Sequence, residues 1–274
     1  MSLEDVRLPS VAEEETRQFL RLLEGLSPGD YSAPSGVGEW TRRDLAAHVA
    51  GSARTYAGWI ERGLDGVIEP PRGRSFVRGQ AATDAIAARV GSTGEAFPEG
   101  PVAALSELSA GLATVLTRLR PEDYSRLLFH PTGVTTIRNL VRFRIAGLAL
   151  HGWDMEIGLD RDAHLSKTAI EVLYDWSTHW LGICFTPAEA GSPTSVYHFE
   201  IEGQPGLKLA VLPGEVFFDD IESAPDATFV FDAEMYVLFV AGRVSYDDAI
   251  ASGRMQVDGD EAIARSFRDR FPSL

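Results

Sequence analysis

The stretch TIRNLVRFRIAGLALHGWDMEIG, residues Thr136–Gly158, decides the fold of this chain. Its apolar side chains recur at steps of three and four residues, which is the period of an amphipathic helix. These side chains are Ile137, Leu140, Val141, Ile145 and Leu148. Thr135 or Thr136 can cap the start, and Gly158 can end the helix. The sequence therefore predicts a helix with one buried face.

This helix carries an imidazole and a carboxylate at the end of its apolar face. Continuing the stripe from Leu148 by three residues reaches His151, and three more reach Asp154. Polar groups on a buried face are costly unless they are paired or bind something. Either His151 is a core residue tied to Asp154, or the pair belongs to a functional site. A second histidine, His48, lies on the inward face of a helix that Thr41 can cap, which favours the functional site.

Length, charge and cysteine content limit the classes of protein to which this chain can belong. The chain has 274 residues, which predicts two domains. A net charge of −15 argues against nucleic acid and anionic membranes as partners, because both are bound chiefly through Lys and Arg. The single cysteine, Cys184, excludes an internal disulfide framework and suits a reducing cytoplasm. With no apolar run of ~18 residues and no signal-peptide pattern, we expect a cytoplasmic protein. Its expected oligomeric state is a monomer or a weak homodimer.

The N-terminal part reads as a helical bundle. Apolar periodicity predicts principal helices at about residues 11–26, 42–60, 101–119 and 136–158, and a short helix at 83–90. Four long helices joined in this way favour an antiparallel four-helix bundle. The connection from Gly63 to Gly79 is rich in Gly, Pro and Arg, and is either a solvated loop or a flap over a site.

The periodicity changes after residue 194. One more helix is predicted at 168–185, and a stretch rich in Pro, Gly and Ala then marks the domain boundary. Strands are predicted at 195–202, 207–212, 215–219, 227–231 and 255–257, with helices at 233–242, 246–252 and 260–271. The fold class is therefore α+β with two domains, residues 1–185 as the bundle with a linker helix and 186–274 as a small sheet domain.

Two separated stretches together resemble one known family. WTRRDLAAHVAG (Trp40–Gly51) with HGWDMEIGL (His151–Leu159) is similar to the signatures of the metal-binding N-terminal domain of the mycothiol-dependent maleylpyruvate isomerases, which are DinB-like four-helix bundles. The stretch Pro225–Phe267 resembles the C-terminal domain of the same family, which is like sterol-carrier-protein-2. The resemblance covers most of the chain and implies the same two-domain α+β fold.

The resemblance implies a metal site and also shows a departure from it. In the family a divalent metal, usually zinc, is held by a histidine on the second helix and by a carboxylate and a histidine on the last. These positions correspond to His48 and His151, but Gly147 stands where the carboxylate belongs. Catalytic zinc normally needs three protein ligands. Asp154 is the nearest replacement on that face, and its alternative role is to orient a ligand histidine.

The chemistry that the resemblance implies joins a small-molecule thiol to a small electrophile. The metal would bind mycothiol and lower the pKa of its thiol, so that thiolate attacks the electrophile. An isomerase expels the thiol again, whereas a transferase keeps the adduct. Arg243, in the AGR motif of the C-terminal domain, is the candidate for binding a substrate carboxylate. Its structural alternative is to tie the helix end to Asp247 or Asp248.

Two other functions stay open at this point. The loss of the carboxylate at Gly147 is compatible with a metal-free family member that acts as a binding or regulatory protein. A lipid-binding role for the C-terminal domain is the third hypothesis, because its strands carry enough apolar side chains to line a tunnel. The same side chains also suffice for an ordinary core; they are Phe199, Ile201, Phe217, Phe218, Phe229 and Phe231.

Overall fold

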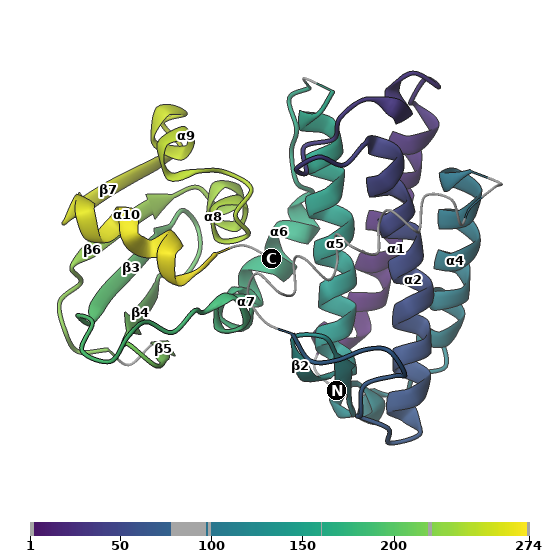
Figure 1. Ribbon diagram of the computed structural model, residues 1–274, viewed down its shortest axis with the longest axis horizontal. Coiled ribbons are helices and arrows are strands. Elements are labelled where there is room, and N and C mark those ends of the chain that lie inside the picture. The colour runs from purple at the N-terminus through teal and green to yellow at the C-terminus, as the bar shows by residue number, and fades with distance from the viewer. Residues whose placement is uncertain (1–2, 78–96, 98–99, 160, 219–220, 273–274) are drawn as a thin grey trace. The chain divides into compact units, whose positions relative to one another are not determined.

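The structure is a computed structural model that describes residues 3–77, 97, 100–159, 161–218 and 221–272. The chain divides into two compact units, Met1–Ala169 and Ile170–Leu274. The first unit is helical and the second contains a sheet (Figure 1), so the α+β class predicted from the sequence is confirmed. No helix among the described residues is long and apolar enough to cross a membrane.

Four long helices form the first unit. They are α1 (Leu3–Glu24), α2 (Arg42–Leu64), α4 (Pro101–Leu116) and α5 (Ile137–Ile157). Helix α2 packs against α4 and α5, and α1 packs against the same two helices, which makes a four-helix bundle (Figure 1). Its apolar core draws on all four helices and includes Phe19, Leu23, Leu45, Val49, Leu105 and Leu148. The bundle predicted from the apolar periodicity is therefore present.

Helices α2 and α5 run antiparallel, and contacts at both ends show it. Gly36, just before α2, donates its backbone N–H to the carbonyl of Asp154 near the end of α5, at 2.9 Å. At the other end, the α-carbon of Gly63 in α2 faces Leu128, which precedes α5. Residues early in α2 therefore lie beside residues late in α5.

The first helix begins earlier than the sequence predicted. A start at residue 11, with Ser10 as the cap, is wrong, because α1 begins at Leu3 and continues through Pro9. The Ser10 hydroxyl donates to the carbonyl of Arg7 instead of capping the helix, at 2.7 Å. Leu8 and Val11 on either side of Pro9 are 1% and 4% exposed, so burial of this face outweighs the lost backbone hydrogen bond. The short helix predicted at 83–90 lies outside the described residues.

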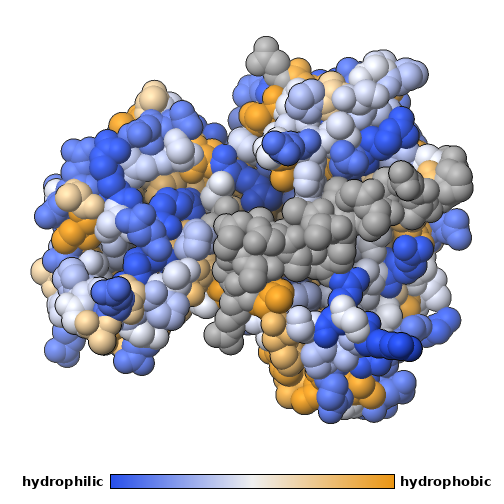
Figure 2. All heavy atoms as spheres, viewed as in Figure 1, coloured by the Kyte–Doolittle hydropathy of each residue, from blue (hydrophilic) through white to orange (hydrophobic). Residues whose placement is uncertain are grey.

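Short elements join the long helices. The 3-10 turn η1 (Asp30–Ser32) precedes α2. The 3-10 turn η3 (Pro121–Ser125) precedes a hairpin of β1 (Leu127–His130) and β2 (Gly133–Thr136). Thr136 caps α5 by accepting from the N–H of Asn139. In Figure 2, hydrophobic atoms gather at the end of the bundle that carries this hairpin, where Leu127 and Val134 are exposed.

The single helix predicted at 168–185 is two helices. Helix α6 (Lys167–Asp175) and helix α7 (Ser177–Cys184) are separated at Trp176. Trp176 has φ −101° and ψ −1°, so the backbone leaves the helical ladder there. Its side chain is 2% exposed. Burial of this large indole accompanies the change of direction, which the apolar period alone did not indicate.

A five-stranded sheet organises the second unit. The strands are β3 (Ser195–Ile201), β4 (Leu207–Val211), β5 (Val216–Phe218), β6 (Ala227–Phe231) and β7 (Met255–Gly259). Their order is β5-β4-β3-β6-β7, with only the central β3–β6 pair parallel. Helices α8 (Ala233–Val240), α9 (Tyr246–Ala251) and α10 (Glu261–Arg270) complete the unit. Buried aromatic rings from β3, β6, α8 and α10 contact one another and form its core, among them Phe199, Phe229, Phe231, Phe239 and Phe267.

Candidate functional site

His48 lies in the second turn of α2, and the capping interactions at the start of this helix set its position. Thr41 caps this helix by accepting from the N–H of Asp44, and the Asp44 carboxylate accepts from the N–H of Thr41. The ring of Trp40 lies 5.2 Å from the ring of His48, measured between centroids. Burial lowers the pKa of His48 to about 3, and the neighbouring charges of His151 and Arg144 act in the same direction. His48 is therefore a neutral imidazole at physiological pH.

His151 is oriented by Asp154. The Nδ1 atom of His151 lies 2.9 Å from Oδ2 of Asp154, whose side chain is 1% exposed. When Asp154 is ionised its carboxylate only accepts hydrogen bonds, and Nδ1 of His151 then carries the proton and donates it. The lone pair of the imidazole is then on Nε2, on the opposite side of the ring. Asp154 thus stands where a carboxylate orients a ligand or base histidine.

The two histidines face each other across α2 and α5. Their ring centroids are 5.3 Å apart, and the ring planes meet at 84°. Two imidazoles on one tetrahedral zinc, each with a Zn–N bond of 2.0–2.1 Å, have centroids about 5 Å apart. The spacing therefore fits two histidines that share one metal ion. Helical spacing predicted that each ring points inward, and the tertiary structure brings the two together.

The described residues do not supply a third ligand. Among them, no group of three or more His, Cys, Asp or Glu side chains is arranged to hold a metal ion. A Cβ atom built on Gly147 meets no heavy atom of the described residues within 4 Å, so these residues leave open the space where a carboxylate side chain could stand. The donor set fits two ligands of a catalytic metal and falls one short of the usual three. The predicted metal role of His48, His151 and Asp154 stays a prediction.

The loop before α2 is locked onto the end of α5. A Cβ atom on Gly36 would lie 2.6 Å from the carbonyl oxygen of Asp154, so only glycine allows this approach. Arg42, at the start of α2, donates to the carbonyl of Gly158, which follows α5. These two contacts set the register that brings His48 to His151. Neither residue was among the site candidates predicted from the sequence.

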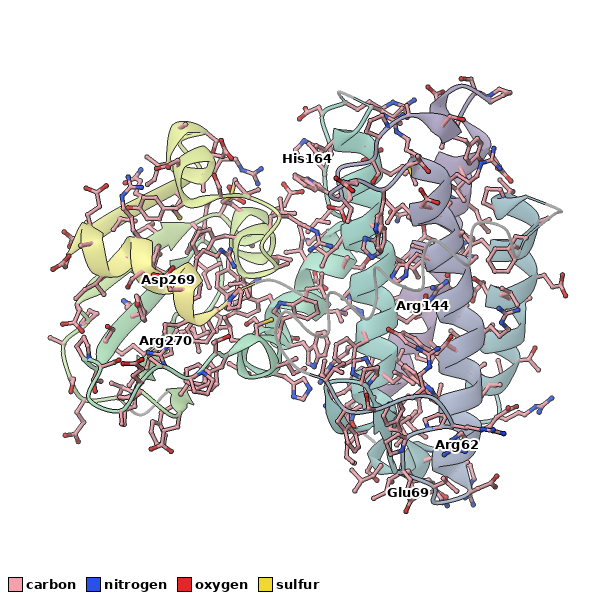
Figure 3. All side chains as sticks on the ribbon, in the orientation of Figure 1. Arg62, Glu69, Arg144, His164, Asp269 and Arg270 are labelled. Carbon is pink, nitrogen blue, oxygen red and sulfur yellow. The ribbon has the colours of Figure 1, made fainter. Side chains whose placement is uncertain are left out.

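A buried arginine lies two turns before His151 on α5. Arg144 is 3% exposed, and Figure 3 labels it within the bundle. Its Nη1 donates to the carbonyl of Val49 at 2.7 Å and to the hydroxyl of Ser52 at 2.8 Å, and its Nη2 donates to the hydroxyl of Ser109 at 3.1 Å. Burial lowers the pKa of Arg144 to about 10, so the side chain stays cationic at neutral pH. Its place on an apolar stripe, four residues after Leu140, was the signal in the sequence that could have identified it.

Arg243 belongs to the second unit. Its Nη1 donates to the carbonyl of Ala241 at the end of α8, at 3.1 Å. Asp247, one of its two predicted partners, is paired with Arg265 at 2.8 Å. The carboxylate of Asp248 accepts from the hydroxyl of Ser245. The substrate-binding role of Arg243 stays a prediction.

Comparisons with known proteins agree with this architecture. A family model described as the mycothiol maleylpyruvate isomerase N-terminal domain matches residues 12–156. A crystal structure of the mycothiol-dependent maleylpyruvate isomerase is 15% identical, with a TM-score of 0.62 and coverage of 93% of this chain and 92% of that one. A variant of that isomerase with a histidine changed to alanine gives 14% identity and a TM-score of 0.60 over the same shares, 93% and 92%.

One sterol-carrier match covers a smaller part of the chain. A sterol carrier protein 2-like protein from Aedes aegypti is 16% identical and covers 38% of this chain and 96% of its own, with a TM-score of 0.28. The curated protein sequences give no match. At these identities the likeness to solved structures concerns the fold.

Proposed function

This chain belongs to the family of the mycothiol maleylpyruvate isomerase N-terminal domain, and we propose that it is a mycothiol-using enzyme that acts on a small electrophilic substrate. It either transfers the mycothiol group to the substrate or isomerises the substrate. The observation that carries the proposal is the pair of facing imidazoles, 5.3 Å apart, with the carboxylate of Asp154 behind His151. This is an arrangement of nitrogen donors on two facing helices of one bundle, which is how bundles build reactive sites.

His48, His151 and Asp154 are proposed to set the protonation states that a thiol-binding metal site needs. Low pKa keeps the imidazole of His48 neutral, and Asp154 fixes the tautomer that presents Nε2 of His151. A divalent metal such as zinc, held by these two nitrogens, would supply the charge that keeps a bound thiol ionised. Arg243 is proposed to bind a carboxylate of the electrophile. We further propose a cytoplasmic monomer or weak homodimer.

A second candidate function rests on Gly147. With open space instead of a third donor, the bundle could keep its shape and bind a small ligand without a metal. Such a protein would act by binding or regulation and would not process mycothiol. The two candidates differ in metal content and in thiol chemistry, which are both measurable on the full chain.

The test combines elemental analysis with a mycothiol assay. Near-stoichiometric zinc in the wild type, lost in His151→Ala, together with mycothiol-dependent conversion of small electrophiles, supports the enzyme. The control is Gly147→Glu, which places a carboxylate in the open space beside the histidines. A wild type without metal and without mycothiol-dependent turnover, and a Gly147→Glu variant that gains metal, would refute the enzyme and support the metal-free binding protein.

A further inference from the structure

The guanidinium of Arg144 is a buried cation with neutral partners. Its three hydrogen bonds end on the carbonyl of Val49 and the hydroxyls of Ser52 and Ser109. Within the described part of the chain, no carboxylate forms an ion pair with it. Buried charges are normally paired, because an uncompensated charge in a low-dielectric interior is costly. This cation is therefore poised to attract an anion.

Two N–H donors of Arg144 have no acceptor among the described residues. A guanidinium has five N–H donors, and the three hydrogen bonds to Val49, Ser52 and Ser109 use two on Nη1 and one on Nη2. The N–H of Nε and the second N–H of Nη2 have no partner among the residues that the structure describes. These two donors sit on neighbouring nitrogens of one rigid plane, and such pairs of donors match the two oxygens of a carboxylate.

Open space lies one turn along the same helix face. Gly147 is three residues after Arg144, about 4.5 Å along the axis, and residues three apart share a face. A Cβ atom at Gly147 would meet no heavy atom within 4 Å among the residues that the structure describes. Between residues 143 and 150 of α5, every residue except Gly147 is buried, so this is the point at which that part of the helix is accessible. His151 continues the face by one more turn.

Asp154 does not neutralise this cation. It lies ten residues further along α5, about 15 Å up the axis, and its carboxylate is engaged with His151. His48, which faces the same region from α2, is neutral because burial lowers its pKa to about 3. Tyr56, on the same side of α2 as Ser52, is neutral as well, because burial raises its pKa to about 12. Among the described residues, the charge around this guanidinium is thus positive, inside a chain of net charge −15.

We propose that the space beside Gly147 binds a small carboxylate from solution, which accepts hydrogen bonds from the two remaining N–H donors of Arg144. The carboxylate occupies the place that an acidic side chain at position 147 would fill. A carboxylate group of a larger molecule meets the same donors. The site exists in the metal-free protein, so it stands independently of the proposed enzymatic function.

The test is titration of the metal-free, full-length protein with sodium acetate. Thermal unfolding is followed in EDTA at constant ionic strength, with sodium chloride and sodium phosphate as parallel titrations. We expect a saturable rise of Tm with acetate that chloride does not reproduce, since a ligand that binds only the folded state stabilises it. An equal rise with chloride or with phosphate would overturn the carboxylate site, because it would mean that the space takes any anion.

Two matched variants at one position separate charge from size. Gly147→Glu supplies the carboxylate from the chain itself, and Gly147→Gln fills the same space without a charge. We expect acetate affinity to fall at least about tenfold in both. Gly147→Glu should also unfold about 2 °C or more above Gly147→Gln, because only Glu pairs with Arg144. Equal Tm values for the two variants, or an acetate response retained in Gly147→Glu, would refute the site.

A variant of the arginine completes the test. Arg144→Gln removes the cation and should abolish the acetate response. If Arg144→Gln fails to fold, the two Gly147 variants still decide the outcome, because they add to an open space and remove no contact. A folded Arg144→Gln variant that binds acetate as tightly as the wild type would refute the assignment to Arg144.

Discussion

Replacement of Gly36 by alanine tests how the two histidine-bearing helices are held together. Gly36 precedes α2 and donates its N–H to the carbonyl of Asp154 at 2.9 Å. The added methyl group would lie 2.6 Å from that oxygen and 3.2 Å from both the carbonyl carbon and Cα of Asp154. All three atoms belong to the helix backbone, so no flexible side chain can move away. The loop and the end of α5 must separate by about 0.5–1 Å to reach an ordinary contact.

The energetic cost follows from these contacts. Overpacking a tight site costs about 1–3 kcal/mol, and weakening the Gly36 hydrogen bond adds about 1 kcal/mol. We therefore expect Gly36→Ala to lose about 2–4 kcal/mol of unfolding free energy. For a unit of this size, each kcal/mol lowers Tm by about 2–4 °C, so Tm should fall by roughly 5 °C or more. Circular dichroism at a helical wavelength measures this directly.

A matched substitution on α2 provides the control. A Cβ atom on Gly58 meets no heavy atom of the described part of the chain within 4 Å, so Gly58→Ala adds the same methyl group without a clash there. Alanine is the better helix former by about 0.5–1 kcal/mol, and Tm should rise slightly. A Gly36→Ala protein that unfolds within 1 °C of the wild type would refute the argument that this glycine sets the register of α2 against α5.

Two further predictions concern His48 and Ser52. The pKa of His48 is lowered from 6.5 to about 3, so the unfolded chain binds a proton before the folded one does. Acidification from pH 6.5 towards 3 should therefore reduce the stability of the wild type relative to His48→Gln, by up to about 1.4 kcal/mol per pH unit. Urea unfolding of both proteins at pH 7, 6 and 5 measures this. A difference in unfolding free energy between them that stays constant with pH would contradict the prediction. Ser52→Ala removes a 2.8 Å acceptor of buried Arg144 and should cost about 1.5–3 kcal/mol in the same assay. Thr55→Ala, which removes a hydroxyl bonded within its own helix, should cost about 0.5 kcal/mol or less, and equal losses would contradict the role of Ser52.

Most elements of the fold were predictable because their signals are local. The capping box of Thr41 and Asp44, the cap at Thr136 and the alternation of the strands each depend on residues a few positions apart. The same local logic placed His151 and Asp154 on one helix face, and the structure joins them at 2.9 Å. Local logic failed at Pro9 and Trp176, where burial against distant side chains decides where a helix begins or breaks.

The sequence by itself determined which polar groups lie on apolar helix faces, because that depends only on spacing along one helix. Tertiary structure decided that His48 and His151 meet, with ring centroids 5.3 Å apart. It also decided that Arg144 reaches Val49 and Ser52 across the bundle. These outcomes depend on the register of α2 against α5. That register is set by contacts between residues more than 90 positions apart, among them Arg42 with Gly158, which no periodicity within one helix can specify.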